Sequence, residues 1–220
     1  MNAARRVIVP LQIAPDAPAL GACVHTLQGQ SMGTTWCVKL SGPRHLKASA
    51  LQRAVEETLG AVVAQMSPWE TGSAISRFNR AAAGEWHTLP AEFSQVMGAA
   101  LQVAGASGGA FDPTAGELVN LWGFGPPGPV TRAPAPEALD AARARAGWQR
   151  LTLQAGRLRQ PGGATLDLSA IAKGFAVDQI ARLLHARGFG DHLVEVGGEL
   201  RGSGLRPDGQ PWWVDLQLPP

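Results

Sequence analysis

The chain has 220 residues, which is enough for one large domain or two small ones with a substantial buried core. Its formal net charge of +2 removes the electrostatic case for binding nucleic acid or an anionic membrane surface. Apolar residues make up 45% and charged residues 16% of the chain, which indicates a globular protein, and no apolar run approaches the roughly 18 residues of a membrane-spanning helix.

The N-terminal residues 1–27 are expected to be a loose leader before the first strand. Leu20-Gly21-Ala22-Cys23 is similar to a bacterial lipoprotein cleavage box, but the apolar region that a signal peptide needs is interrupted at Pro10, Gln12, Pro15 and Asp16. We therefore expect a cytoplasmic protein, with an inner-membrane lipoprotein anchored on the periplasmic side through Cys23 as the alternative. Cys23 and Cys37 stand in no metal-binding or redox spacing, which argues against a disulfide framework and a zinc site.

Strands and helices alternate along the rest of the chain. Residue type and turn signals predict strands over 34–40, 151–153, 157–159, 164–168, 192–196, 199–202 and 212–218. Apolar residues at helical spacing predict helices over 44–66 and 91–104. Cap and stop signals at Gly147, Ser169 and Gly188 predict helices over 136–146 and 170–187. The order lacks the regularity of a parallel sheet, so we expect an α+β fold with a mixed, largely antiparallel sheet packed with helices. The chain stops straight after its last predicted strand, which leaves a sheet edge uncovered and suggests that the C-terminal portion of the fold is missing.

The strongest functional signal is an acidic residue at the end of a strand, followed by a helix with an early lysine. Asp167 ends the strand, Ser169 is a good N-cap, and Lys173 falls in the first turn of the helix that begins at Ala170. A lysine there opposes the helix dipole unless an anion docks on the helix N-terminus. The alternative is a lysine that lies along an ordinary amphipathic helix, and spacing alone leaves both open.

A glycine-containing loop is the second candidate. Gly108 and Gly109 permit a ligand to approach the backbone closely, and Asp112 can accept a hydrogen bond from a ligand amine or hydroxyl. Thr114 and Glu117 also match a capping box for the helix that follows, which explains these two residues without any ligand.

A tryptophan on a polar turn is the third candidate. Ser67 and Glu70 match another capping box, with Pro68 at the first helical position. Trp69 lies between them and is a candidate stacking platform for a planar ring. A tryptophan folded back onto the core is the equally weighted alternative.

Taken together, five segments resemble the FAD:protein FMN transferases, also called the ApbE flavin transferases, and they occur in the family's order. They are Ser31–Thr34, Ser73–Asn79, Gly109–Thr114 with Leu121–Gly125, Asp167–Asp178, and Val196–Glu199. The resemblance runs from about residue 28 to 218 and implies one flavin transferase domain over 28–220, equal to the N-terminal two thirds of the family domain. It implies binding of FAD and Mg²⁺, and transfer of FMN to a Ser or Thr hydroxyl of a target flavoprotein with release of AMP. An FAD pyrophosphatase and a truncated, non-catalytic flavin-binding fragment are the alternatives.

The resemblance also assigns residues. It places the FAD contacts at Met32, Trp69, Ala110, Phe111, Asp112, Asp167 and Lys173. Lys173 is expected to neutralise charge in catalysis, and Ala170 falls on a magnesium ligand position, where alanine offers only its backbone carbonyl. The family commonly has Tyr where Trp69 stands, and Trp stacks at least as well. The family's other metal ligands fall beyond residue 220, so turnover by this chain stays open. The expected partner is a target flavoprotein acceptor, with no nucleic acid and no transmembrane segment.

Overall fold

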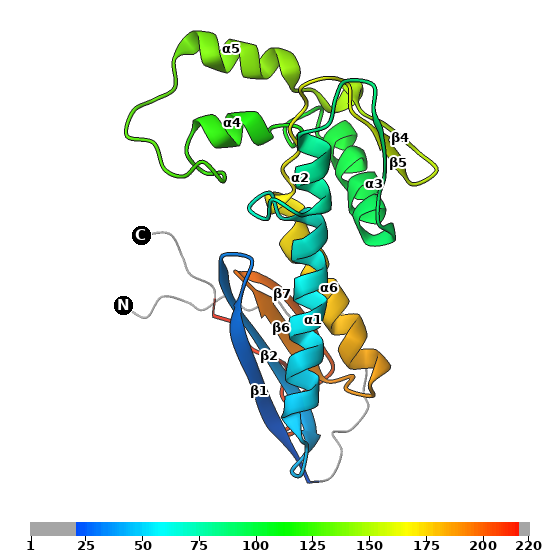
Figure 1. Ribbon diagram of the computed structural model, residues 1–220. Coiled ribbons are helices and arrows are strands. Elements are labelled where there is room, and N and C mark those ends of the chain that lie inside the picture. The colour runs from blue at the N-terminus through cyan, green and yellow to red at the C-terminus, as the bar shows by residue number, and fades with distance from the viewer. Residues whose placement is uncertain (1–20, 216–220) are drawn as a thin grey trace. The chain divides into compact units, whose positions relative to one another are not determined.

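The computed structural model describes residues 21–215, and these fold into two compact units (Figure 1). The first unit combines residues up to 58 with residues from 176 onward, and the second is formed by residues 59–175. Helices and antiparallel sheets occur in both units, which confirms the α+β fold class. Within residues 21–215, no helix is long and apolar enough to cross a membrane.

The first unit is built on a four-stranded antiparallel sheet in the order β1-β2-β6-β7. Its strands are β1 (Ala22–Ser31), β2 (Thr34–Pro43), β6 (His192–Val196) and β7 (Glu199–Ser203). Strand β1 thus begins within the stretch 1–27 that the sequence assigns to a leader, and residues 1–20 lie outside the described part of the chain. Cys23, the candidate lipid anchor, is paired with Gly42 of β2.

The turn between β1 and β2 carries the first candidate site residue. Ser31 pairs with Thr34, so Met32 and Gly33 alone form the turn, with φ values of 54° and 71°. Positive φ at both central residues is typical of a type I′ hairpin turn, which follows the right-handed twist of its strands. Gly33 adopts this conformation without steric cost, whereas Met32 is a non-glycine residue held in it by the flanking strands.

One face of this sheet is buried, as the period-2 pattern of apolar residues predicts. Trp36, Val38 and Leu40 of β2 are fully buried, and they lie opposite Val196, Val194 and His192 of β6. Helices α1 (Ala48–Met66) and α6 (Ser169–Ala186) contribute residues 48–58 and 176–186 to the unit. The Nε2 amide of Gln52 in α1 donates to the carbonyl of Gln28 in β1 at 3.1 Å.

His192 makes the stability of this buried face dependent on pH. Its side chain is 2% exposed, and burial lowers the pKa of His192 below the ordinary value of 6.5. The unfolded chain therefore binds a proton at a higher pH than the folded chain does, and the free energy of unfolding should fall as pH drops below about 6.5. We expect His192→Leu to remove this part of the pH dependence, as measured by urea unfolding between pH 8 and 5.5. Parallel pH profiles for the variant and the wild type would contradict the assignment.

The second unit is mostly helical. Its helices are α2 (Ala74–Asn79), α3 (Ala91–Ala106), α4 (Gly116–Leu121), α5 (Pro136–Arg145) and the short 3₁₀ helix η1 (Trp148–Arg150). A small antiparallel sheet in the order β3-β5-β4 completes it, formed by β3 (Trp86–Thr88), β4 (Thr152–Gln154) and β5 (Arg157–Arg159). The largest fully buried side chains of this unit are Phe78, Phe93, Leu59, Ile75, Met97, Leu158, Leu166 and Leu168.

Two of the predicted strands do not form in the described residues, so these two predictions are wrong. The segment 164–168 forms only an isolated parallel bridge between Thr165 and Ala115, because a side chain from α2 takes up the backbone groups of Leu166. Residues 212–215 form no strand, and the Trp212 side chain rather than the backbone bonds to β7, through Nε1 to the Ser203 carbonyl at 3.0 Å. The rest of that predicted strand lies outside the described residues.

Candidate functional site

Two motifs that are far apart in the sequence lie side by side in the second unit. The backbone N–H of Asp167 donates to the carbonyl of Pro113 at 2.9 Å, and the N–H of Gly116 donates to the carbonyl of Thr165 at 3.0 Å. These two bonds place the segment that follows Asp112 against the segment that ends at Asp167. The structure thus brings together the two chain segments that adjoin the candidate carboxylates.

Gly116 allows this close approach. A Cβ atom at this position would lie 2.7 Å from the carbonyl oxygen of Thr165 and 2.9 Å from that of Leu166. Both distances are shorter than any tolerated carbon–oxygen contact, so a side chain here would force the two segments apart.

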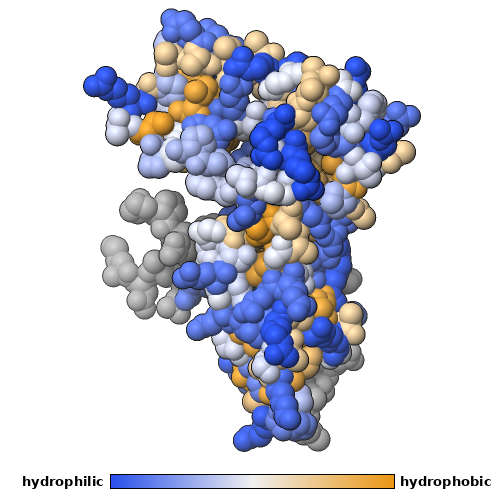
Figure 2. All heavy atoms as spheres, in the orientation of Figure 1, coloured by the Kyte–Doolittle hydropathy of each residue, from blue (hydrophilic) through white to orange (hydrophobic). Residues whose placement is uncertain are grey.

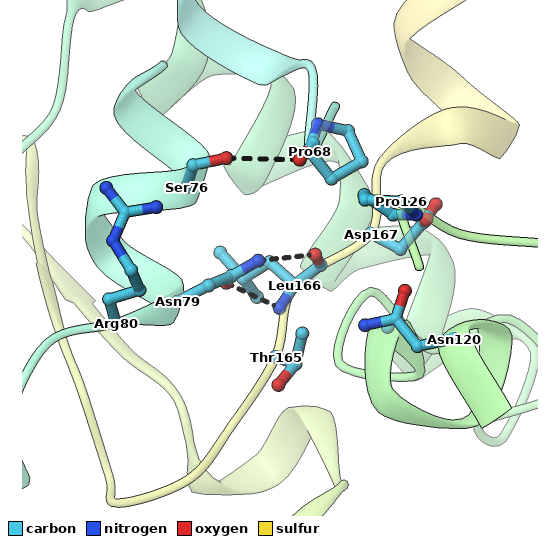
Figure 3. Close-up of a pocket in the computed structure, with 10 residues that line it drawn as sticks. Pro68, Ser76, Asn79, Arg80, Asn120, Pro126, Thr165, Leu166 and Asp167 are labelled. Atoms are coloured by element: carbon cyan, nitrogen blue, oxygen red, sulfur yellow. Dashed lines mark hydrogen bonds between the residues drawn. The ribbon is translucent and has the colours of Figure 1, made fainter. Parts of the chain in front are cut away.

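Asn79, the last residue of α2, anchors the same segment from the other side. Its Nδ2 donates to the carbonyl of Leu166 at 3.0 Å, and its Oδ1 accepts from the N–H of Leu166 at 2.8 Å (Figure 3). Leu166 is fully buried, so the asparagine satisfies two backbone groups that water does not reach. This pair of bonds fixes the chain immediately before Asp167.

Helix α2 is started by Ser73, and the capping box predicted at Ser67 and Glu70 is wrong. Ser73 Oγ accepts from the N–H of Ser76 at 3.1 Å and donates to the carbonyl of Ser67 at 2.7 Å. Ser67 thus contributes a carbonyl acceptor to the turn rather than a side-chain cap.

A polar pocket of about 160 Å³ lies where these segments meet (Figure 3). Its lining comes from the turn before α2, from α2, from α4 and the loop after it, and from the segment before α6. The lining residues are Pro68, Ser76, Asn79, Arg80, Gly116, Asn120, Pro126, Thr165, Leu166 and Asp167. Figure 3 shows the side chains of Asn79 and Arg80 on one side of the pocket and that of Asn120 on the other. Such a pocket suits the polar parts of a ligand.

Asp167 also takes the capping role that the sequence assigns to Ser169. Its Oδ1 accepts from the N–H of Ser169, the first residue of α6, at 2.8 Å. Lys173 follows in the next turn and is half-buried, while Ala170 is exposed. The Ala170 carbonyl belongs to a helical residue, and its first lone pair serves the helix hydrogen-bond ladder.

The second predicted capping box, formed by Thr114 and Glu117, is also wrong. Ala115 occupies the N-cap of α4 without a side-chain bond, and Glu117 forms a salt bridge with Arg145 of α5. The Thr114 hydroxyl instead donates to Oδ1 of Asp112 at 2.7 Å and accepts from the N–H of Gly147 at 2.7 Å.

The remaining candidates differ in exposure. Trp69 is 58% exposed and follows Pro68 of the pocket lining, so the alternative of a tryptophan folded onto the core is wrong. Ala110 is exposed and Phe111 is half-buried in the loop before Asp112. Met32 belongs to the first unit, and the other candidates belong to the second.

Sequence reasoning missed the pocket-lining side chains Ser76, Arg80 and Asn120, and it gave Asn79 no role of its own. It included the segment 121–125 among the motifs but gave its exposed aromatic residue no role: Phe124 is 77% exposed, two residues before Pro126 of the pocket lining. Figure 2 shows apolar atoms at the surface where α4 and α5 lie. The signal available for Asn79 and Ser76 was their place in the segment 73–79, which belongs to the motifs noted above.

Comparison with known proteins gives one consistent family. A family model described as "ApbE family" matches residues 32–220. The FAD:protein FMN transferase of Klebsiella pneumoniae (strain 342) is 38% identical over 210 residues, which cover 93% of this chain and 59% of that protein. The FAD:protein FMN transferase of Vibrio cholerae is 37% identical and is covered over 58% of its length. The chain thus spans about three fifths of the curated relatives that it matches.

Solved structures agree with the sequence comparison. The flavin transferase ApbE from Vibrio cholerae superimposes with a TM-score of 0.84 at 37% identity, over 87% of this chain and 62% of that one. The apo form of the Pseudomonas stutzeri flavinyl transferase ApbE gives a TM-score of 0.83 at 38% identity, over 88% of this chain and 65% of that one.

Proposed function

Because the chain belongs to the ApbE family, we propose that it carries the FAD-binding part of an FAD:protein FMN transferase. The acceptor would be a Ser or Thr hydroxyl of a target flavoprotein. Its oxygen forms a bond to the FMN phosphorus, the pyrophosphate P–O bond breaks, AMP leaves with the bonding electrons, and the hydroxyl proton is released. The observation that carries the proposal is the meeting of the segment 113–116 with the segment that ends at Asp167, at one polar pocket.

Each site residue would have the role in FAD binding that its side-chain chemistry allows. Trp69, exposed beside the pocket, would stack on a planar ring of FAD. Asp167 lines the pocket, and its carboxylate, bonded to Ser169 through Oδ1, can accept a further hydrogen bond from an FAD amine or hydroxyl. Lys173, near the start of α6, would neutralise charge on the phosphates together with the helix N-terminus. Ala110 and Phe111 would complete the FAD contacts of this unit, and the contact at Met32 stays a prediction of the resemblance.

The described residues do not by themselves fit the Mg²⁺ ion that the resemblance implies. Among residues 21–215, no group of three or more His, Cys, Asp or Glu side chains could hold a metal ion. Ala170 would offer only the second lone pair of its helical carbonyl, whereas Mg²⁺ prefers near-octahedral oxygen coordination with one or two carboxylates. The Ala170 carbonyl alone does not make a magnesium site, and none of the roles above depends on one.

The proposal is tested with the 220-residue chain, FAD and a flavoprotein acceptor. Fluorescence titration measures FAD binding, chromatography measures AMP release, and mass spectrometry of the acceptor detects a covalent FMN adduct. We expect saturable FAD binding and, where turnover occurs, AMP release matched by adduct. AMP with free FMN and no adduct would replace the transferase by an FAD pyrophosphatase. Failure of the chain to bind FAD would refute the proposal.

Lys173→Ala should weaken FAD binding on the order of tenfold, which corresponds to the loss of one charge-assisted contact with a phosphate. The physical reason is that a cation in this position is favourable when an anion docks at the helix N-terminus. Lys47→Ala, which removes an exposed lysine just before α1, is the control. Equal FAD affinities of the two variants in a fluorescence titration would exclude Lys173 from the phosphate site.

Trp69→Ala should cost on the order of 1 kcal/mol of FAD binding through lost ring stacking, whereas Trp69→Tyr should keep most of the affinity. Because the side chain is 58% exposed, neither substitution should lower the free energy of unfolding appreciably. Quenching of flavin fluorescence measures the affinity, and urea unfolding measures the stability. If the Ala and Tyr variants bind FAD equally, Trp69 does not stack on the flavin.

A further inference from the structure

The carboxylate of Asp112 is occupied by donors from its own chain. Oδ1 accepts from the N–H of Thr114 at 2.8 Å and from its hydroxyl at 2.7 Å, and Oδ2 accepts from the N–H of Trp148 at 3.1 Å. Thr114 is 2% exposed, and its hydroxyl also accepts from the N–H of Gly147 at 2.7 Å. The two side chains therefore tie residues 112–114 to the turn at 147–148 through two hydrogen bonds, from Gly147 and Trp148, and the other two bonds join Thr114 to Asp112.

The turn that they hold packs against the glycine-containing loop. Gly147 has a φ of 123°. In this conformation its N–H donates to the Thr114 hydroxyl, and the N–H of Trp148 donates to the Asp112 carboxylate. The indole of Trp148 lies 3.6 Å from the positions that a Cβ atom would take on Gly105 and on Gly109. A side chain at either glycine would meet the ring, so the ring lies against both ends of the loop 105–109.

Three backbone N–H groups of the loop donate to acceptors within the loop or just before it. The N–H of Gly109 donates to the carbonyl of Ala104 at 2.8 Å, that of Ala110 to the carbonyl of Ser107 at 3.2 Å, and that of Phe111 to Ser107 Oγ at 3.2 Å. These N–H groups have partners within the chain. Ser107, Gly108 and Ala110 are exposed, and Gly109 and Phe111 are half-buried.

We propose that Asp112 and Thr114 are positioning residues for FAD: together they form a clamp on the 147–148 turn that holds the loop 107–111 in its binding conformation. This inference rests on the proposed function and changes the role of Asp112. Its carboxylate contributes by ordering the loop, and the loop meets FAD through Ala110 and Phe111. A fixed loop loses no conformational entropy when the ligand arrives, and this raises affinity.

Three variants separate positioning from direct contact. Thr114→Val keeps the size of the side chain but removes the hydroxyl, and Thr114→Ser restores the hydroxyl. Asp112→Asn presents an amide N–H₂ to one of the backbone donors and so breaks the clamp at that end. For each variant, hydrogen exchange of residues 107–111 is measured without FAD, and FAD affinity is measured by fluorescence titration. Phe93→Leu, which perturbs a fully buried residue elsewhere in the same unit, controls for lost stability.

We expect Thr114→Val and Asp112→Asn to accelerate exchange of the loop amides and to weaken FAD binding about tenfold, the scale of one or two lost hydrogen bonds. Thr114→Ser should return both values to within about twofold of wild type, and Phe93→Leu should leave the FAD affinity unchanged. Weaker FAD binding by Asp112→Asn with unchanged loop exchange would mean direct contact and overturn the inference. Faster exchange with unchanged FAD affinity would overturn it as well.

The exchange measurement separates this inference from the proposed function, because it needs no FAD. If the wild type binds no FAD and Thr114→Val still accelerates loop exchange, the proposed function fails while the clamp itself stands. If the wild type binds FAD but Thr114→Val leaves loop exchange unchanged, the clamp fails and the proposed function stands.

Discussion

Replacing Gly116 by alanine should destabilise the second unit by about 3 kcal/mol, the upper end of the cost of overpacking, and abolish FAD binding. The new Cβ atom would lie 2.7 Å and 2.9 Å from two backbone oxygens, of Thr165 and Leu166. Neither oxygen can move aside cheaply, because Asn79 holds Leu166 by both of its backbone polar groups. We expect the two segments to move apart to relieve this overlap. Their separation breaks the hydrogen bond from the Gly116 N–H and disrupts the pocket.

Gly98→Ala is the matched control. Gly98 lies inside α3 of the same unit, and a Cβ atom there would meet nothing within 4 Å. Alanine in a helix interior should therefore stabilise the protein by about 0.5–1 kcal/mol. The free energies of unfolding of the two variants, measured in urea, should shift in opposite directions. In FAD titration, only Gly116→Ala should lose affinity. If Gly116→Ala is as stable as wild type, the close approach of the two segments is not as the structure has it.

The helices with strong local signals could be predicted from the sequence. The helix expected over 91–104 is α3, Ala91–Ala106, and the helix expected over 136–146 is α5, Pro136–Arg145. The apolar spacing of the first helix and the stop residue Gly147 after the second are local signals, which do not depend on the rest of the chain. The segment 164–168 is equally apolar but forms no regular strand, because its backbone partners are a side chain and one isolated bridge. No local pattern reveals such a partner.

The site residues also divide into those that local signals identify and those whose role depends on a remote partner. Asp112, Asp167 and Trp69 stood out by local signals: a carboxylate after two glycines, a carboxylate at the end of a predicted strand and a tryptophan on a polar turn. The hydroxyl of Thr114 also stood out, but local spacing gave it the wrong role, since its partner Gly147 is 33 positions away. A capping box and a clamp to a remote turn use the same threonine, and only the fold decides between them.

Asn79 is the clearest case of a residue whose role depends on a remote partner, since Leu166 lies 87 positions away. Asn79→Ala should lower the free energy of unfolding by about 3 kcal/mol, because it leaves the buried N–H and C=O of Leu166 without partners. FAD binding should fall with it, because the chain that positions Asp167 is no longer held. Urea unfolding and FAD titration measure the two effects.

Asn79→Asp provides a sharper test, because its outcome depends on pH. An ionised carboxylate can accept from the Leu166 N–H but meets the Leu166 carbonyl with a second oxygen, whereas a protonated carboxyl can donate to that carbonyl. The folded state would thus favour the protonated form and raise the pKa of the new carboxyl above its unfolded value. Stability is then highest at low pH and is lost as pH rises through the folded pKa. We expect the stability gap between Asn79→Asp and wild type to narrow from pH 8 to pH 5. A gap that does not change with pH would show that the Asn79 amide does not donate to Leu166.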